Sequence, residues 1–147
     1  MKLKILVGMA LALSTVGTAA IAAEDPIATR KAMMQNVGAA TGAGAAMVKG
    51  EAEFNAATAE LVLRTMNTAA LGIGELFPAG SETGGKSTAS PKIWEDRAGF
   101  DTAMAKFAAD TAAGIKAKPA DLDAFKAAFG AAAANCGACH KAYRIKK

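Results

Sequence analysis

Helical segments separated by turn-forming residues make up most of this 147-residue sequence, and they restrict the chain to an all-α fold. No run of alternating apolar and polar residues is long enough to predict a β-strand. Asp25 followed by Pro26 is typical of a helix N-cap and first helical position, so a first helix is predicted to run to Lys49, before Gly50. A second helix is predicted from about Glu51 to Leu76.

Two further helices follow residues 78–90, which are rich in glycine and serine and predict a loop. Ser90-Pro91 repeats the cap-then-proline signal and opens a third helix that is predicted to end near Gly114. A fourth is predicted to begin around Asp121. Four helices of about 20 residues, each roughly 30 Å long and joined mostly by short connections, predict an antiparallel up-down-up-down four-helix bundle.

Three glycines, Gly38, Gly42 and Gly44, interrupt the first predicted helix. Each costs about 1 kcal/mol of helix stability relative to alanine. They either mark positions of close helix packing or are simply tolerated, and both interpretations remain open at this point.

Both cysteines and the only histidine of the chain lie together near its end, as Cys136, Cys139 and His140. The C-x-x-C-H pattern is typical of c-type haem attachment, in which each thiol adds to a vinyl group and the histidine offers a neutral nitrogen to the iron. The pattern predicts one covalently attached haem c, held by Cys136 and Cys139, with His140 as the proximal ligand.

Two other interpretations of these residues fit less well. A redox-active C-x-x-C needs a thioredoxin-like strand and helix setting, whereas the flanking sequence is alanine-rich and helical. A structural zinc ion needs four nitrogen or sulfur ligands, and the chain offers only three good ones.

The first residues have the features of an export signal. Lys2 and Lys4 form a basic start, residues 5–16 an apolar core, and residues 20–22 a small-residue cleavage site. An uncleaved membrane anchor is the alternative, but the glycine, serine and threonine content and the Ala-Ile-Ala ending favour removal. We therefore expect residues 1–22 to be a signal peptide and the protein to be periplasmic, without stable membrane insertion.

The remaining residues, 23–147, have the length of one domain. The formal charge of +4 falls to +2, from 15 basic and 13 acidic residues, once Lys2 and Lys4 are removed. Neither a concentrated basic face nor a recognisable motif indicates a nucleic-acid partner. The cluster of Arg144, Lys146 and Lys147 either docks an acidic redox partner or forms a solvated tail.

Residues 23–147 resemble the c-prime cytochromes, including their low-spin, methionine-ligated relatives, over nearly their whole length. The position of C-x-x-C-H at the C-terminus is itself distinctive. The other matching segments are Arg30-Lys31-Ala32-Met33-Met34, Lys49-Gly50-Glu51, Phe77-Pro78, Thr83-Gly84-Gly85, Pro91-Lys92-Ile93-Trp94-Glu95 and Lys141-Ala142-Tyr143-Arg144.

The resemblance implies roles for three further residues near the haem. Arg30 would bind a haem propionate, since a guanidinium offers paired donors to a carboxylate; the alternative is an ordinary surface base. Arg144 matches the basic residue that flanks the proximal histidine. Thr83 lies in the loop that commonly approaches the haem edge.

The resemblance also places Met34 on the distal side of the iron, where the family divides into two branches. In the gas-binding branch this side chain only blocks an open sixth position, and nitric oxide or carbon monoxide can enter. In the low-spin branch a methionine thioether binds the iron and the protein carries electrons. The Arg30 match fits the first branch, as does a role for Met34 as core filler. The Met33-Met34 pair and residues 77–80 match the second, and we favour Met34 as a ligand.

The favoured function is a periplasmic cytochrome that carries single electrons between redox partner proteins. The alternative is a five-coordinate haem protein that binds nitric oxide or carbon monoxide. An enzyme is not expected, since a peroxidase-like reaction needs a distal acid-base group and the chain has no second histidine. The resemblance further implies a possible homodimer formed through the first two helices.

Overall fold

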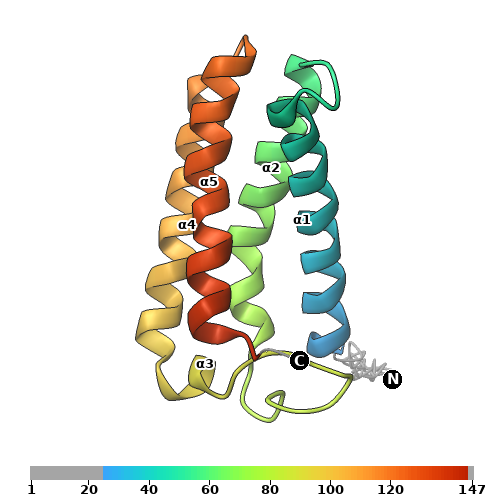
Figure 1. The fold of residues 1–147 in the computed structure, drawn as a ribbon. Helices are drawn as coiled ribbons and strands as arrows, with labels where there is room; N and C mark the ends of the chain where they lie inside the picture. The colour runs from blue at the N-terminus through green and yellow to red at the C-terminus, as the bar shows by residue number, and fades with distance from the viewer. Residues whose placement is uncertain (1–24, 146–147) are drawn as a thin grey trace, which may run out of the picture.

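A computed structural model describes residues 25–145, which form an antiparallel bundle of four long helices (Figure 1). The long helices are α1 (Pro26–Lys49), α2 (Ala56–Gly72), α4 (Arg97–Ala117) and α5 (Leu122–Tyr143). Two short elements, the 3-10 helix η1 (Ile73–Leu76) and the one-turn helix α3 (Lys92–Glu95), flank the long loop at one end of the bundle. The predicted all-α, up-down-up-down bundle is confirmed.

The predicted signal peptide, residues 1–22, lies outside the described residues, as do Lys146 and Lys147. Within residues 25–145, none of the helices combines the length and the apolar character needed to cross a bilayer. The export signal and its removal stay predictions.

The first helix begins and ends where its capping residues predict. The Asp25 carboxylate accepts hydrogen bonds from the backbone N–H groups of Ile27 (2.8 Å) and Ala28 (3.2 Å), and Pro26 follows it at the first helical position. At the other end Gly50 adopts a left-handed conformation, with φ of 75°, that lets its N–H reach the last carbonyls of the helix.

The second helix starts five residues later than predicted, at Ala56 instead of Glu51. The N–H groups of Glu51 and Ala52 both donate to the Ala46 carbonyl, so these residues close α1 and do not open α2. Asn55 provides the cap, because its side chain accepts a hydrogen bond of 2.9 Å from the N–H of Thr58.

The third predicted helix is divided in two at Asp96. This residue leaves the helical conformation (φ −127°, ψ 57°) and caps α4 by accepting a hydrogen bond of 3.1 Å from the N–H of Gly99. The predicted end near Gly114 is also wrong, since α4 continues to Ala117 and ends at Lys118, a left-handed residue that precedes Pro119. The start of α5 is as predicted, with the Asp121 carboxylate accepting from the Ala124 N–H at 2.8 Å.

The apolar core has two parts, one along the bundle and one at the loop end. The buried residues of the first include Leu63, Met66, Phe107, Phe125 and Phe129. The second consists of Ile73, Phe77, Ile93, Phe100 and Tyr143. In the second part, Phe100 packs edge-on against both Phe77 and Tyr143, with ring centroids 5.0 and 5.3 Å apart. These rings fix α4, α5 and the residue that follows η1 relative to one another at this end.

The glycines of α1 have two different explanations. A Cβ atom added at Gly44 would lie 2.5 Å from Cε2 of Phe129, so Gly44 is a position of close packing. A Cβ added at Gly38 or Gly42 would meet nothing within 4 Å. Those two glycines are therefore not required by contacts among the described residues.

We expect Gly44→Ala to lower the free energy of unfolding by about 1–3 kcal/mol, because the added methyl group overpacks the contact with Phe129. Gly42→Ala is the matched control and should raise it by about 1 kcal/mol, through helix propensity alone. Chemical denaturation of the purified protein measures both changes. Stabilisation by Gly44→Ala would contradict the close packing.

Candidate haem-binding site

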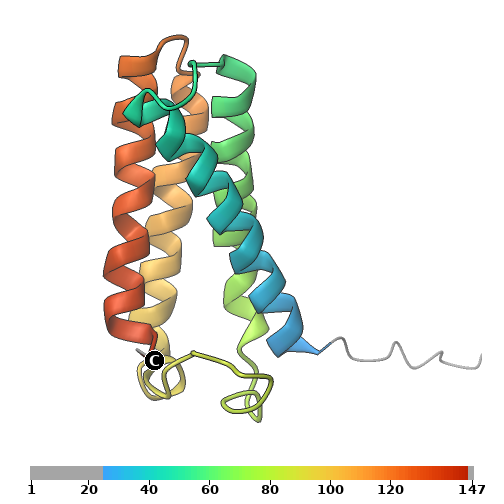
Figure 2. The same cartoon turned by 45° about the vertical axis from the view of Figure 1, so that its right-hand side comes forward.

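A cavity of about 660 Å³ lies between α1 and α5 at the loop end of the bundle. α1 runs obliquely to the other helices, and its N-terminal half stands away from α5 (Figure 2). The volume is within the range of roughly 300–1,000 Å³ that is usual for cofactor sites. The cavity is formed by the same end of the bundle that carries the C-x-x-C-H motif.

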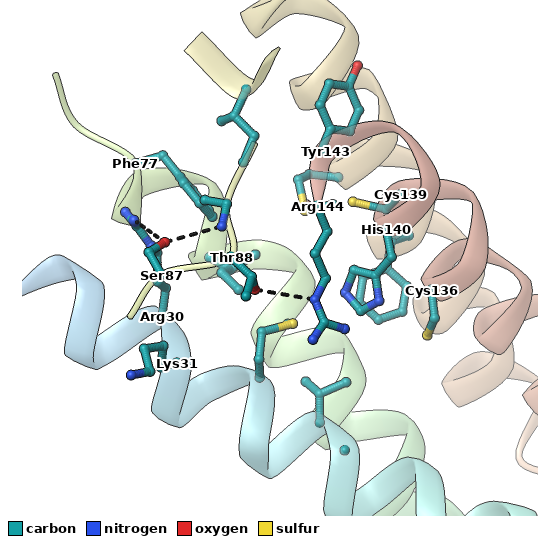
Figure 3. Close-up of a pocket in the computed structure, with 18 of the residues that line it drawn as sticks. Arg30, Lys31, Phe77, Ser87, Thr88, Cys136, Cys139, His140, Tyr143 and Arg144 are labelled. Atoms are coloured by element: carbon teal, nitrogen blue, oxygen red, sulfur yellow. Dashed lines mark hydrogen bonds between the residues drawn. The ribbon is translucent and has the colours of Figure 1, made fainter. Parts of the chain in front are cut away.

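The three residues of the motif line this cavity from a single helix. Cys136 and Cys139 are separated by three residues on α5, so their side chains lie on one side of it, and His140 follows directly (Figure 3). Burial raises the pKa of both thiols, and at Cys139 the neighbouring Cys136 adds to the effect. The structure thus brings together all three residues that the sequence predicts for haem attachment.

His140 has the properties of a neutral nitrogen ligand. Partial loss of solvent around the ring, and then the positive charge of Arg144, lower the pKa of its imidazole. The neutral form is the one that binds a metal ion. No hydrogen bond joins the imidazole to another of the described residues, so its ring nitrogens are not committed within this part of the chain.

The rest of the lining fits a flat apolar ring that carries carboxylates at its edge. Apolar side chains form most of the wall, among them Val37, Ile73, Phe77, Phe100 and Phe107. Arg30, Lys31, Lys86 and Arg144 also line the cavity, and no acidic residue does so among the described residues. The wall and the bases suit the two parts of a haem, its macrocycle and its propionates.

Arg30 is buried, with 4% of its surface exposed, so the alternative of an ordinary surface base is wrong. Its Nη1 donates to the Leu76 carbonyl and the Ser81 hydroxyl, both at 3.0 Å. Its Nη2 donates to the Ser81 carbonyl at 2.7 Å and to the Ser87 hydroxyl at 3.2 Å. The guanidinium also lies 4.6 Å from the centre of the Phe77 ring. Arg30 therefore binds the loop, a role that sequence reasoning missed.

The charge of Arg30 has no carboxylate within ion-pair distance among the described residues. Burial lowers the pKa of its guanidinium, although the negative charges of Asp25 and Glu82 oppose this effect. A buried cation that is met only by neutral acceptors favours the approach of an anion. A propionate bound near Arg30 remains a prediction with this support.

Residues 77–90 form a loop that connects the two walls of the cavity. Next to Arg30, the Lys31 ammonium donates to the Gly85 carbonyl at 2.6 Å. At the α5 side, the Ser90 N–H donates to the Tyr143 carbonyl and the Ile145 N–H donates to the Thr88 carbonyl, at 3.0 and 2.9 Å. The loop is thus attached both to α1 and to the end of α5.

Thr88, not Thr83, is the loop threonine that reaches the cavity. Thr83 is exposed and lies beside a smaller hollow of the same loop, so the structure does not bring it to the other predicted site residues. The Thr88 hydroxyl accepts a hydrogen bond of 3.3 Å from Nε of Arg144, which extends from the end of α5 along the cavity (Figure 3). The role of Thr83 at the haem edge stays a prediction without structural support.

Met34, not Met33, lines the cavity from α1. The terminal methyl group of Met33 lies 3.8 Å from the position that a Cβ of Gly72 would occupy, so Met33 is directed toward α2. Met104 on α4 also lines the cavity and was missed by sequence reasoning. Its spacing of four residues from Phe100 places it on the same side of its helix as that buried ring, which was the available signal.

Comparison with known proteins identifies the family to which this site belongs. The family model described as Cytochrome C' matches residues 25–144. The chain is 43% identical to cytochrome c' of Rhodopseudomonas palustris over 128 residues, 87% of each protein. It is 38% identical to cytochrome c-556 of Agrobacterium fabrum over 128 residues, 87% of this chain and 86% of the relative.

Solved structures agree with the sequence matches. A structure of cytochrome c' from Rhodopseudomonas palustris has a TM-score of 0.80 at 43% identity, covering 84% of this chain and 98% of that one. A nitric oxide complex of a cytochrome c prime mutant from Alcaligenes xylosoxidans has a TM-score of 0.73 at 33% identity, covering 84% and 96%.

We expect Arg30→Leu to lower the free energy of unfolding by about 2–4 kcal/mol, because it leaves buried carbonyl and hydroxyl acceptors of the loop without a donor. Arg64→Leu is the matched control, since Arg64 is exposed and, among the described residues, pairs only with Glu60 of its own helix. It should change stability by less than about 1 kcal/mol. Denaturant titration distinguishes the two, and equal small losses would contradict the structural role of Arg30.

Proposed function

The chain belongs to the cytochrome c' family and carries one covalently attached haem c, and on this basis we propose a periplasmic carrier of single electrons with His140 and Met34 as its iron ligands. The haem supplies a metal centre that gains and loses one electron. Cys136 and Cys139 hold the haem to α5. Arg30 and the other basic residues that line the cavity attract its propionates.

The observation that carries this proposal is the placement of Met34. Its thioether lines the cavity from α1, whereas His140 lines it from α5, so the two ligands come from opposite walls. A soft sulfur ligand opposite an imidazole favours a low-spin iron suited to electron transfer.

A second candidate function, binding of nitric oxide or carbon monoxide, is supported by the space beside Met34. Gly38 lies one helical turn after Met34 and lines the same cavity, and a Cβ added there would meet nothing within 4 Å. This space would let the Met34 side chain move aside for a small ligand. A mutant of the related Alcaligenes xylosoxidans protein has been solved as its nitric oxide complex.

The predicted export signal supports the periplasmic location, since haem is joined to C-x-x-C-H after a bacterial chain crosses the membrane. The redox partners are proteins, and the exposed bases Lys31 and Arg144 at the cavity favour partners with an acidic surface. We assign no catalytic residue. Among the described residues that line the cavity, His140 is the one imidazole, and it is the proposed proximal ligand.

We expect Met34→Ala to convert a low-spin ferrous protein into a high-spin one whose spectrum shifts when carbon monoxide is added, because the sixth iron ligand is lost. Met33→Ala is the matched control and should leave the low-spin bands unchanged, since Met33 is directed toward α2. Optical spectra of the purified ferrous proteins measure this. A wild-type spectrum that is already high-spin and sensitive to the gas would favour the second candidate function.

We also propose a homodimer formed through α1 and α2. Leu61 and Leu71 of α2 are 65% and 69% exposed, so they offer apolar surface that a second copy could bury. The neighbouring helix α1 exposes small residues, including Ala32, Ala39 and Ala43, which allow close approach of a second copy.

We expect the double substitution Leu61→Glu and Leu71→Glu to shift the protein from dimer to monomer, because like charges would face each other across the interface. Ala112→Glu, at an exposed position of α4, is the control and should leave the dimer intact. Sedimentation equilibrium of the haem-containing proteins measures the mass. A wild-type protein that stays monomeric at micromolar concentrations would refute the proposal.

A further inference from the structure

We infer that Tyr143 and Asp96 form a positioning pair that fixes the last turn of α5 and, through it, the orientation of the His140 imidazole. The inference rests on the proposed function in one respect, that His140 is the proximal iron ligand. Neither Tyr143 nor Asp96 is proposed as an iron ligand. The pair acts on the His140 imidazole through the backbone of α5.

Among the described residues, no hydrogen bond orients the His140 imidazole. A histidine that binds a metal is usually oriented by a hydrogen bond from its second ring nitrogen to a carboxylate, carbonyl or water. No such bond to His140 exists among residues 25–145. Within the described residues, the direction of the ring therefore depends on the helix that carries it.

Tyr143 is placed to hold that helix. It lies three residues after His140, one turn further along α5, and is 8% exposed. Its hydroxyl donates a hydrogen bond of 3.0 Å to Oδ2 of Asp96, and its ring packs edge-on against Phe100. Tyr143 lines the cavity, and Figure 3 shows its hydroxyl directed away from the imidazole.

Asp96 is itself fixed by the start of α4. Its Oδ1 accepts the N–H of Gly99 at 3.1 Å while its Oδ2 accepts the Tyr143 hydroxyl, so one carboxylate caps α4 and holds α5. The departure of Asp96 from helical geometry, which divides α3 from α4, allows this double contact.

Gly99 provides the space that the pair occupies. A Cβ atom added there would lie 2.6 Å from the Tyr143 hydroxyl oxygen and would also meet the Asp96 carboxylate. Glycine is unfavourable in a helix, and at this position any larger residue would displace the hydrogen bond. The presence of glycine at position 99 thus agrees with a role for the Tyr143–Asp96 hydrogen bond.

A similar contact lies at the other end of the C-x-x-C-H motif. Asn135, directly before Cys136, donates to Oδ2 of Asp110 on α4 at 2.7 Å. On each side of the motif, a side chain of α5 is therefore joined by a hydrogen bond to an acidic residue, Asp110 within α4 and Asp96 at its N-cap. The Tyr143 contact is the one on the His140 side.

The test uses haem-containing Tyr143→Phe, which removes only the hydroxyl, and Asp96→Ser, which keeps a good helix cap but cannot reach Tyr143. In the ferric protein, the NMR shifts of the haem methyl groups report the orientation of the axial imidazole. We expect both variants to change the pattern of these shifts in the same way. The double variant should add nothing further, because both changes break one contact.

Asn67→Ala is the control, since it removes hydrogen bonds from Asn67 to Thr111 and to the Ala108 carbonyl, which join α2 to α4 away from the motif. It should lower stability without altering the methyl shifts. The inference is wrong if Tyr143→Phe leaves the shifts unchanged, or if Asn67→Ala alters them equally. If one of the two pair variants does not fold, the other decides alone. If the wild-type protein shows no resonances of a haem-bound histidine, His140 is not the ligand and the proposed function is wrong too. The wild-type spectrum alone shows this, so this failure is distinguished from failure of the positioning role.

Discussion

The loop end of the bundle depends on the hydrogen bonds of the buried Arg30 guanidinium. Long helices usually pack with their axes 8–10 Å apart, yet α1 and α5 leave a cavity of about 660 Å³ between them. Arg30 binds α1 to the loop by three hydrogen bonds and to the end of η1 by a fourth, and the loop is bound in turn to the end of α5. The two walls are thus connected around the cavity and not across it.

The same residue links the shape of the site to its charge. A guanidinium that has left water and is met only by neutral oxygens has lost solvation without gaining a counterion. A carboxylate at this end of the cavity would supply one, while the apolar wall of Phe77, Phe100 and Phe107 would enclose a ring. The cavity is therefore suited to an amphiphilic flat molecule, which agrees with the haem c of the family.

The sequence predicted the parts of the structure that local chemistry controls. The caps at Asp25 and Asp121 and the haem motif on α5 depend on residues within one turn of each other. The predicted helix boundaries were wrong where contacts between residues far apart in the sequence determine the structure. Asp96 interrupts the third helix because its carboxylate holds both Gly99 and Tyr143, and the second of these is 47 residues away.

Long-range packing also explains what was missed in the site. The motif gave Cys136, Cys139 and His140 because their spacing on one helix is sufficient. Whether Thr83 or Thr88 reaches the cavity depends on the path of a loop with positive φ at Gly84, Gly85 and Lys86, which no pattern of single residues specifies. The buried role of Arg30 was hidden for the same reason, since its partners lie 46 to 57 residues along the chain.

The position of Met34 follows from these contacts. Arg30 and Met34 are four residues apart on α1, so the turn that the loop holds is next to the turn that would present the thioether to the iron. Gly38, one turn further on, leaves free space beside it. Under the proposed ligation, Arg30 sets how far this part of α1 stands from His140, and Gly38 sets how easily the Met34 side chain can move away. The balance between a bound thioether and an open sixth position therefore depends on three residues at successive turns of one helix.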